Sequence, residues 1–186
     1  MADITGAFLL GPDSGRVLIK TGRAGLAARA GHDLTIEITR WTARVTIPSD
    51  GVTSAEITAE LDLGSLAVRE GTGGAKPLSD RDRGEIVKTA GKILGAGATA
   101  SFASTRVVPA ASGSGGVIEG TLTLNGRSAP VTLQIVSPAS DRYRGSATIK
   151  QTDFGITPYS GFFGALKLRD EIGVEFETDL DRAGRE

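Results

Sequence analysis

The chain contains a single histidine, His32, which is followed directly by Asp33. A histidine beside a carboxylate is typical of general-base catalysis, and histidine is also a common metal ligand. On a strand, however, consecutive side chains point to opposite faces, so these two groups are poorly placed to act as a base and its orienting partner. We therefore favour for His32 a structural role or a polar contact with the head of a ligand, with catalysis and metal binding as the alternatives.

The rest of the sequence offers little further chemistry. It has no cysteine and no second histidine, and no carboxylates at a metal-ligand spacing, so we expect neither a metal nor a cofactor. Glu56, Glu60 and Asp62 alternate along a predicted strand, which is typical of its solvent-exposed face. The glycine-rich stretch 71–74 lacks the spacing of a phosphate-binding loop, and there is no G-x-S-x-G motif. We therefore predict that the protein is not an enzyme.

Length and charge restrict the class of protein. The 186 residues suit one domain, predicted to cover 1–186, in which residues 181–186 have no apolar anchor and form a frayed tail. The formal net charge of −1, without a dense basic run, argues against a nucleic-acid partner. No segment resembles a transmembrane span or a signal peptide, so we expect a cytoplasmic protein, or an exported one if a signal was removed. An exposed sheet edge is compatible with a homodimer.

Apolar and polar residues alternate along most of the chain, which predicts β-strands. Within 34–47 the apolar positions change from even to odd numbers around Thr39 and Arg40, which predicts a bulge or sharp bend. The turn sequences at 11–15 and at Asn125-Gly126 predict hairpins. The expected strands cover residues 5–10, 16–22, 34–38, 41–47, 54–63, 99–108, 117–126, 129–136, 143–150 and 168–180.

One segment, residues 79–95, has helical rather than alternating periodicity. Ser79 is a suitable N-cap, with Asp82 three residues later as a short form of the capping box, and Gly95 suits the C-terminal end. The apolar stripe of this helix should pack on the sheet. With 34–38 and 41–47 counted as one bent strand, the chain has roughly eight or nine antiparallel strands. Together with one inserted helix they indicate an all-β sandwich or a closed barrel, and the periodicity fits both a filled and a hollow interior.

Four stretches together carry a family pattern, in this order along the chain: "GHDL" at 31–34, "SFAST" at 101–105, "GTLTLNGRSAPVTLQI" at 120–135 and "QTDFGITPYSGFFGALKLRDEIGVEFE" at 151–177. Over about residues 6–178 the chain resembles the YceI-like family of lipocalin-like, polyisoprenoid-binding proteins. The matching positions are Gly120, Leu122, Thr123, Leu124, Gly126, Pro130, Val131, Leu133 and the element Asp153–Ile156.

The resemblance implies a lipocalin-like, eight-stranded antiparallel barrel with one inserted α-helix and a short helical, aromatic lid over one end. It also implies an isoprenoid or other lipid-like ligand, such as an isoprenoid quinone, in the interior. In "PYSGFFGA" the glycines allow a tight backbone path, so we predict either a lid in which Phe162 or Phe163 contacts the bound tail or an ordinary aromatic plug. The apolar residues on the in-phase strand faces either form an ordinary core or line the ligand site. The predicted ligand-binding residues are His32, Ile36, Ile38, Leu61, Phe102, Leu122, Leu124, Leu133, Ile135, Phe154, Tyr159, Phe162, Phe163, Val174 and Phe176.

Three functions follow from these observations. The first is a carrier or sequestering protein that buries an apolar tail in the barrel, with the polar head hydrogen-bonded by His32 or Tyr159 near the mouth. The second is an isomerase or hydrolase that uses the cavity, with His32 as the base and a polar partner from another strand. The third is a stress-associated or interaction module with a filled barrel and no ligand.

Overall fold

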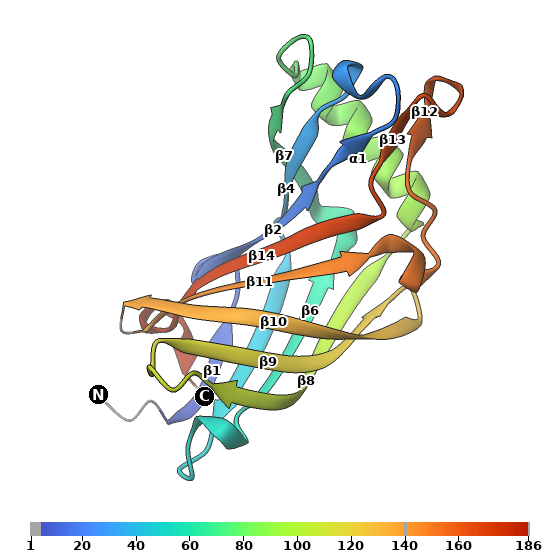
Figure 1. Ribbon diagram of the computed structural model, residues 1–186. Coiled ribbons are helices and arrows are strands. Elements are labelled where there is room, and N and C mark those ends of the chain that lie inside the picture. Colours follow the sequence, from blue (N-terminus) through green and yellow to red (C-terminus); the bar gives the residue numbers. More distant parts are fainter. Residues whose placement is uncertain (1–4, 140, 186) are drawn as a thin grey trace.

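The computed structural model describes residues 5–139 and 141–185, which form mainly antiparallel β-structure (Figure 1). Within these residues, twelve strands form a main sheet, three short strands form a second sheet, and one α-helix, α1, covers Asp80–Leu94. The second sheet contains β3 (Arg23–Ala24), β12 (Ser160–Gly161) and β13 (Leu166–Leu168). The main sheet contains β1 (Gly6–Leu10), β2 (Gly15–Thr21), β4 (Asp33–Ile38), β5 (Trp41–Ile47), β6 (Glu56–Asp62), β7 (Leu66–Thr72), β8 (Thr99–Pro109), β9 (Gly115–Leu124), β10 (Arg127–Ala139), β11 (Arg142–Lys150), β14 (Glu171–Asp179) and β15 (Gly184–Arg185).

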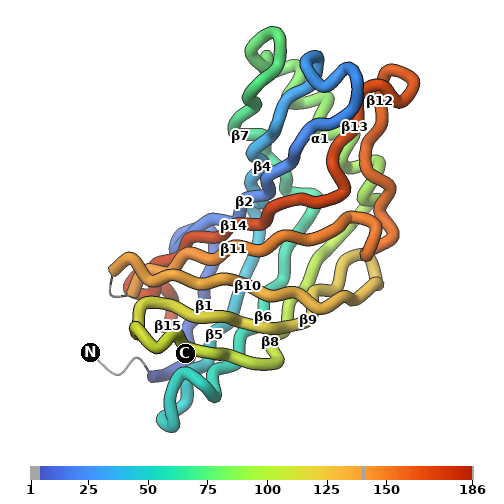
Figure 2. Tube along the Cα trace, viewed as in Figure 1, coloured from blue at the N-terminus to red at the C-terminus, as the bar shows by residue number. Residues whose placement is uncertain are grey.

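The main sheet curls back on itself because strands that are consecutive in the chain lie near opposite edges of the sheet. In space the strands follow the order β15-β1-β5-β6-β8-β9-β10-β11-β14-β2-β4-β7. β1 leads into β2, β4 into β5 and β6 into β7, and each of these pairs has one member near either end of that order. The wall that results is barrel-like and encloses an interior (Figures 1 and 2). The all-β class is therefore confirmed, whereas the main sheet has twelve strands rather than eight, in part because corners divide three long β-segments.

The predicted bend at Thr39 and Arg40 is one of these corners. Ser65, buried between β6 and β7, holds it: the Thr39 hydroxyl donates to the Ser65 carbonyl (2.9 Å), and the Arg40 backbone N–H donates to the Ser65 hydroxyl (2.9 Å). The side chains on either side of the corner, Ile38 and Trp41, are both buried. The change of phase in the sequence therefore keeps apolar residues on the inner face across the bend.

The turn at residues 11–14 is not the hairpin that the sequence predicts. The Ser14 backbone N–H donates to the Gly11 carbonyl (2.9 Å), so the chain does turn there. However, β1 pairs with β5 and β15, whereas β2 pairs with β14 and β4. The turn is another corner of the curled sheet, because the backbone on either side of it finds different partner strands. The other predicted turn, at Asn125-Gly126, does join paired strands β9 and β10, and both residues have positive φ (50° and 76°), as a tight hairpin turn requires.

The helix begins and ends as the sequence predicts. The Asp82 backbone N–H donates to the Ser79 hydroxyl (3.2 Å), and the Ser79 backbone N–H donates to the Asp82 carboxylate (2.9 Å), which completes a capping box. Ile86 and Val87 pack with Leu78 on a cluster formed by Leu34, Ile36 and Val68 of the sheet. None of the helices within the described residues is long and apolar enough to cross a membrane.

The C-terminal segment differs from its prediction. We expected residues 181–186 to fray, but Gly184 and Arg185 pair with Leu9 and Phe8 of β1. The Arg185 guanidinium also lies 5.5 Å from the centroid of the Phe8 ring, a cation–π distance. The tail has no apolar anchor of its own, but strand pairing with the edge of β1 and contact with the Phe8 ring hold it in place. Glu186 lies outside the described residues.

Candidate functional site

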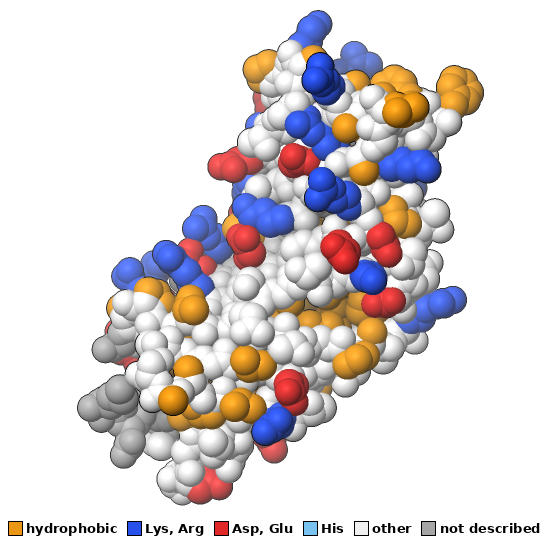
Figure 3. Space-filling view, in the orientation of Figure 1, with side chains coloured by type: hydrophobic (Ala, Val, Ile, Leu, Met, Phe, Trp, Pro, Cys, Tyr) orange, Lys and Arg blue, Asp and Glu red, His pale blue; other side chains and the backbone are white. Residues whose placement is uncertain are grey.

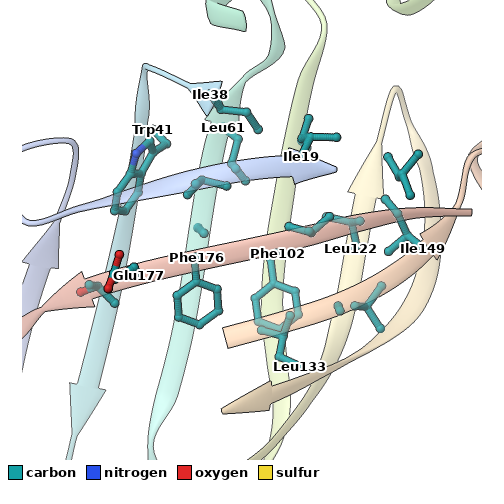
Figure 4. A pocket seen from close by; sticks show the side chains of 18 of the residues that line it. Ile19, Ile38, Trp41, Leu61, Phe102, Leu122, Leu133, Ile149, Phe176 and Glu177 are labelled. Carbon is teal, nitrogen blue, oxygen red and sulfur yellow. The ribbon is translucent and has the colours of Figure 1, made fainter. Parts of the chain in front are cut away.

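The curled sheet encloses a cavity of about 1710 Å³ (Figure 4). Its wall draws on most strands of the main sheet and is mainly aliphatic and aromatic. Alternation along the strands explains this lining: in β6 the residues Ile57 and Leu61 line the cavity, while Glu56, Thr58 and Glu60 are exposed. The long in-phase stretches of the sequence therefore form the inner surface of a container rather than a filled core.

The structure brings most of the predicted ligand-binding residues to this cavity. Thirteen of the fifteen line it: His32, Ile36, Ile38, Leu61, Phe102, Leu122, Leu124, Leu133, Ile135, Phe154, Tyr159, Val174 and Phe176. Ten of them come from six strands of the main sheet, and His32, Phe154 and Tyr159 lie in the connecting segments. Trp41, Ile19 and Ile149 also line the cavity, although the sequence did not single them out as ligand contacts.

Phe162 and Phe163 are the two exceptions. They lie in the short 3-10 helix at Phe162–Gly164, do not line the cavity, and are 66% and 113% exposed. Three consecutive residues there have positive φ: 49° at Phe162, 55° at Phe163 and 89° at Gly164. This left-handed path makes a tight protruding loop that carries both rings outward. The expectation that they contact a ligand inside the barrel is therefore corrected.

Two glycines leave the space that the rings of Phe176 and Phe102 occupy. Phe176 of β14 pairs with Gly145 of β11, and a Cβ atom on Gly145 would overlap the Phe176 ring. A Cβ atom on Gly120 of β9 would likewise overlap the ring of Phe102 from β8. Both rings point into the same space in Figure 4. The sequence reasoning missed the glycine at 145, whose only signal is its place at an inward position of a strand that also carries Ala147 and Ile149.

His32 lies at the end of the cavity nearest the start of α1. Its Nε2 atom donates to the carbonyl of Lys76 (2.7 Å), in the loop between β7 and α1. Asp33 takes a different partner: its carboxylate accepts from the backbone N–H of Arg23 (2.8 Å). The two neighbours therefore do not form a base and its orienting group, as the alternation of a strand predicts. Tyr159, from the segment before β12, also lines the cavity.

One charged residue of the wall is held in two ion pairs. Glu177, at the far end of β14, accepts hydrogen bonds from Arg144 Nε (2.9 Å) and Arg16 Nη2 (2.9 Å). These two guanidinium groups hold the pKa of Glu177 below its ordinary value. Burial raises the pKa of Tyr143, another cavity residue, with a further contribution from the charge of Asp141. Within residues 5–139 and 141–185, no three His, Asp or Glu side chains form a group that could hold a metal ion.

The sheet separates on one side of the cavity. β10 pairs with β11 only from Gln134 onward, so its residues 127–133 have β9 as their partner strand. Leu133 on β10 and Ile149 on β11 line the cavity on the two sides of this separation. Apolar side chains are visible in a hollow of the surface there (Figure 3).

A curled antiparallel sheet around a long apolar cavity, with one helix beside it, defines a lipocalin-like protein. The family model described as the YceI-like domain matches residues 20–180, so the chain belongs to the YceI-like family. The crystal structure of Burkholderia cenocepacia BcnA is similar, with a TM-score of 0.60 and 15% sequence identity over 88% of this chain and 94% of that chain. The Campylobacter jejuni YCEI protein, at 14% identity over 81% of this chain and 85% of that chain, has a TM-score of 0.49. No curated relative matches the chain.

Proposed function

We propose that this protein binds a long apolar amphiphile, an isoprenoid or isoprenoid quinone, inside the barrel-like sheet, and carries or sequesters it. The observation that supports this most directly is the cavity, whose volume of about 1710 Å³ exceeds the roughly 300–1,000 Å³ of ordinary small-molecule sites. A polyprenyl tail has no polar groups to satisfy, so it needs an extended apolar wall and few hydrogen-bond partners. Burial of that tail would contribute roughly 25 cal/mol per Å² of apolar surface.

The polar head of the ligand is assigned to the end of the cavity near His32 and Tyr159. Nε2 of His32 is engaged by the Lys76 carbonyl, which fixes the ring and leaves Nδ1 as its second polar atom. The Tyr159 hydroxyl supplies a second polar group on the wall at the same end. Arg23 and Lys76 line this end together with Asp82 and Glu85, so charges of both signs are available to a polar head.

The two alternatives have less support. Catalysis by His32 requires a polar side chain from another strand to orient the ring, and the partner of its Nε2 atom is a backbone carbonyl. A filled interaction module requires a closed core, which a cavity of about 1710 Å³ argues against. Similarity to YceI-like proteins favours a binding protein over an enzyme.

Trp41 provides the test, because it is the only tryptophan in the chain and lines the cavity. Titration of the purified protein with an isoprenoid quinone should quench its fluorescence saturably, at one equivalent per chain. An isoprenoid alcohol of the same length, which lacks the quinone, should compete for the site and restore the fluorescence. An unsaturable decrease equal to that of free tryptophan would count against binding in the cavity.

A further inference from the structure

Three loops meet at the end of the molecule where α1 begins, and we call this the loop end: residues 22–32, 73–79 and 157–169 (Figures 1 and 2). β3 and β13 pair there, and the Ala27 backbone N–H donates to the Ala165 carbonyl (2.9 Å). The hydrogen bond from His32 Nε2 to the Lys76 carbonyl (2.7 Å) ties the second loop to the first. The three loops therefore form one connected surface.

Apolar side chains project from this surface into solvent. Leu26 is 102% exposed, Phe163 is 113% exposed and Phe162 is 66% exposed. Leu26 lies on the first loop and the two phenylalanines on the third, and the apolar tip at the upper end of the molecule is visible in Figure 3. On an ordinary protein surface, exposed large apolar residues are scattered singly. Here three of them are exposed together on neighbouring loop tips.

The backbone conformation at Phe162 and Phe163 is unusual for aromatic residues. Phe162 and Phe163 have φ values of 49° and 55°, in the left-handed region that favours glycine and asparagine and disfavours bulky side chains. Neither ring lines the cavity or belongs to the described core. Among the described residues, no packing role accounts for an aromatic side chain at either position, which points to a partner outside the chain.

The charge of the loop end identifies the kind of partner. The three loops contain five basic residues and no Asp or Glu, although Asp33, Asp80 and Asp170 directly follow them along the chain. Arg23 is engaged by Asp33 and by the Gly31 carbonyl, whereas the other four are exposed. These four are Arg29, Lys76, Lys167 and Arg169. Basic side chains around projecting apolar residues are the pattern of a surface that binds anionic lipid.

We propose that the loop end docks on anionic lipid bilayers, with Phe162, Phe163 and Leu26 inserted among the acyl chains and the basic residues against the headgroups. Separate projecting side chains suit a fluid apolar phase, whereas a rigid protein partner would need a continuous complementary surface. Docking goes beyond the proposed ligand binding and does not depend on it. It would place the cavity residues Tyr159 and Leu166, on the same loops, next to a membrane that holds apolar ligands.

Vesicle co-sedimentation of the full chain tests this, with vesicles of phosphatidylcholine alone and of phosphatidylcholine mixed with phosphatidylglycerol. The wild type should bind the mixed vesicles, and binding should fall as salt is added. The double variant Phe162→Asn/Phe163→Asn should lose roughly tenfold or more of its partition, because two apolar contacts are removed. Asparagine tolerates the left-handed backbone, so this variant should fold. Val136→Ser is the control, since Val136 is 54% exposed but lies on β10, outside the three loops.

Equal binding by the wild type and the double asparagine variant would overturn the proposal, as would absence of wild-type binding to the mixed vesicles at low salt. A wild-type dimer in solution that the double variant converts to a monomer would also overturn it, in favour of contact with a second copy. Saturable quenching of Trp41 by an isoprenoid quinone, measured without vesicles, reports on the cavity. A failure of ligand binding is thus separated from a failure of docking.

Discussion

The ring of Phe176 lies across Gly145 on the neighbouring strand, where a Cβ atom would overlap it. The ring points into the cavity beside that of Phe102 (Figure 4). Gly145→Ala should therefore displace the ring and lower the free energy of unfolding by about 1–3 kcal/mol, the usual cost of overpacking. Urea unfolding at neutral pH measures the change.

The control for this substitution is Gly84→Ala in α1. A Cβ atom on Gly84 meets nothing within 4 Å, and the position is helical and exposed. Alanine there should raise the free energy of unfolding by about 0.5–1 kcal/mol. If Gly145→Ala is also neutral or stabilising, the ring of Phe176 does not depend on the absence of a side chain at 145.

The capping box of α1 gives a second prediction. Ser79→Ala removes the hydroxyl that accepts from the Asp82 backbone N–H, and it should lower the free energy of unfolding by about 0.5–2 kcal/mol. Ser79→Thr, which keeps a hydroxyl, should recover most of the loss. The measurement is again urea unfolding, and an alanine variant as stable as the wild type would show that packing of Ile86 and Val87 alone fixes the start of the helix.

Glu177 gives a pH-dependent prediction. Hydrogen bonds from Arg144 and Arg16 lower the pKa of Glu177 in the folded protein, so its contribution to stability is present above the ordinary glutamate pKa and is lost as the pH falls through the lower folded value. Glu177→Gln should therefore lose less stability than the wild type between pH 7 and acidic pH. Glu175→Gln, which makes the same charge change on the same strand but removes only the longer pair with Lys20 (3.9 Å), is the matched control. Identical pH profiles for all three proteins would contradict the assignment.

His32 is expected to support the ligand head through the loop that it holds. His32→Ala removes the donor to the Lys76 carbonyl and should weaken isoprenoid-quinone binding by roughly two- to tenfold, the equivalent of one net hydrogen bond. His32→Gln retains a donor and should bind more tightly than the alanine variant. If both variants bind as the wild type does, the head of the ligand lies elsewhere.

Much of the inner wall was predictable because a strand exposes alternate residues to its two faces. The phase change at Thr39 and Arg40 located a corner that Ser65 holds, and Ser79 with Asp82 located the start of α1. These features depend on short-range geometry, so a single sequence carries them.

The errors have long-range causes. The turn at 11–14 has hairpin chemistry, but its flanking strands pair with β5 and β14, partners far along the chain. Phe162 and Phe163 were expected to contact the ligand because the glycines beside them allow a tight backbone path over the barrel mouth, but the left-handed backbone there carries both rings outward. The role of Gly145 could not be predicted from the sequence, because it depends on the Phe176 ring, which belongs to the adjacent strand.

The most direct measurement is native mass spectrometry of the protein loaded with an isoprenoid quinone, for the wild type and two matched variants. Ala59 lines the cavity and Thr58, beside it on β6, is exposed on the outer face. We predict one bound quinone per chain in the wild type and in Thr58→Phe, and a clear loss in Ala59→Phe, whose ring occupies the cavity. Equal loading of the two variants, or no loading of the wild type, would contradict binding inside the sheet.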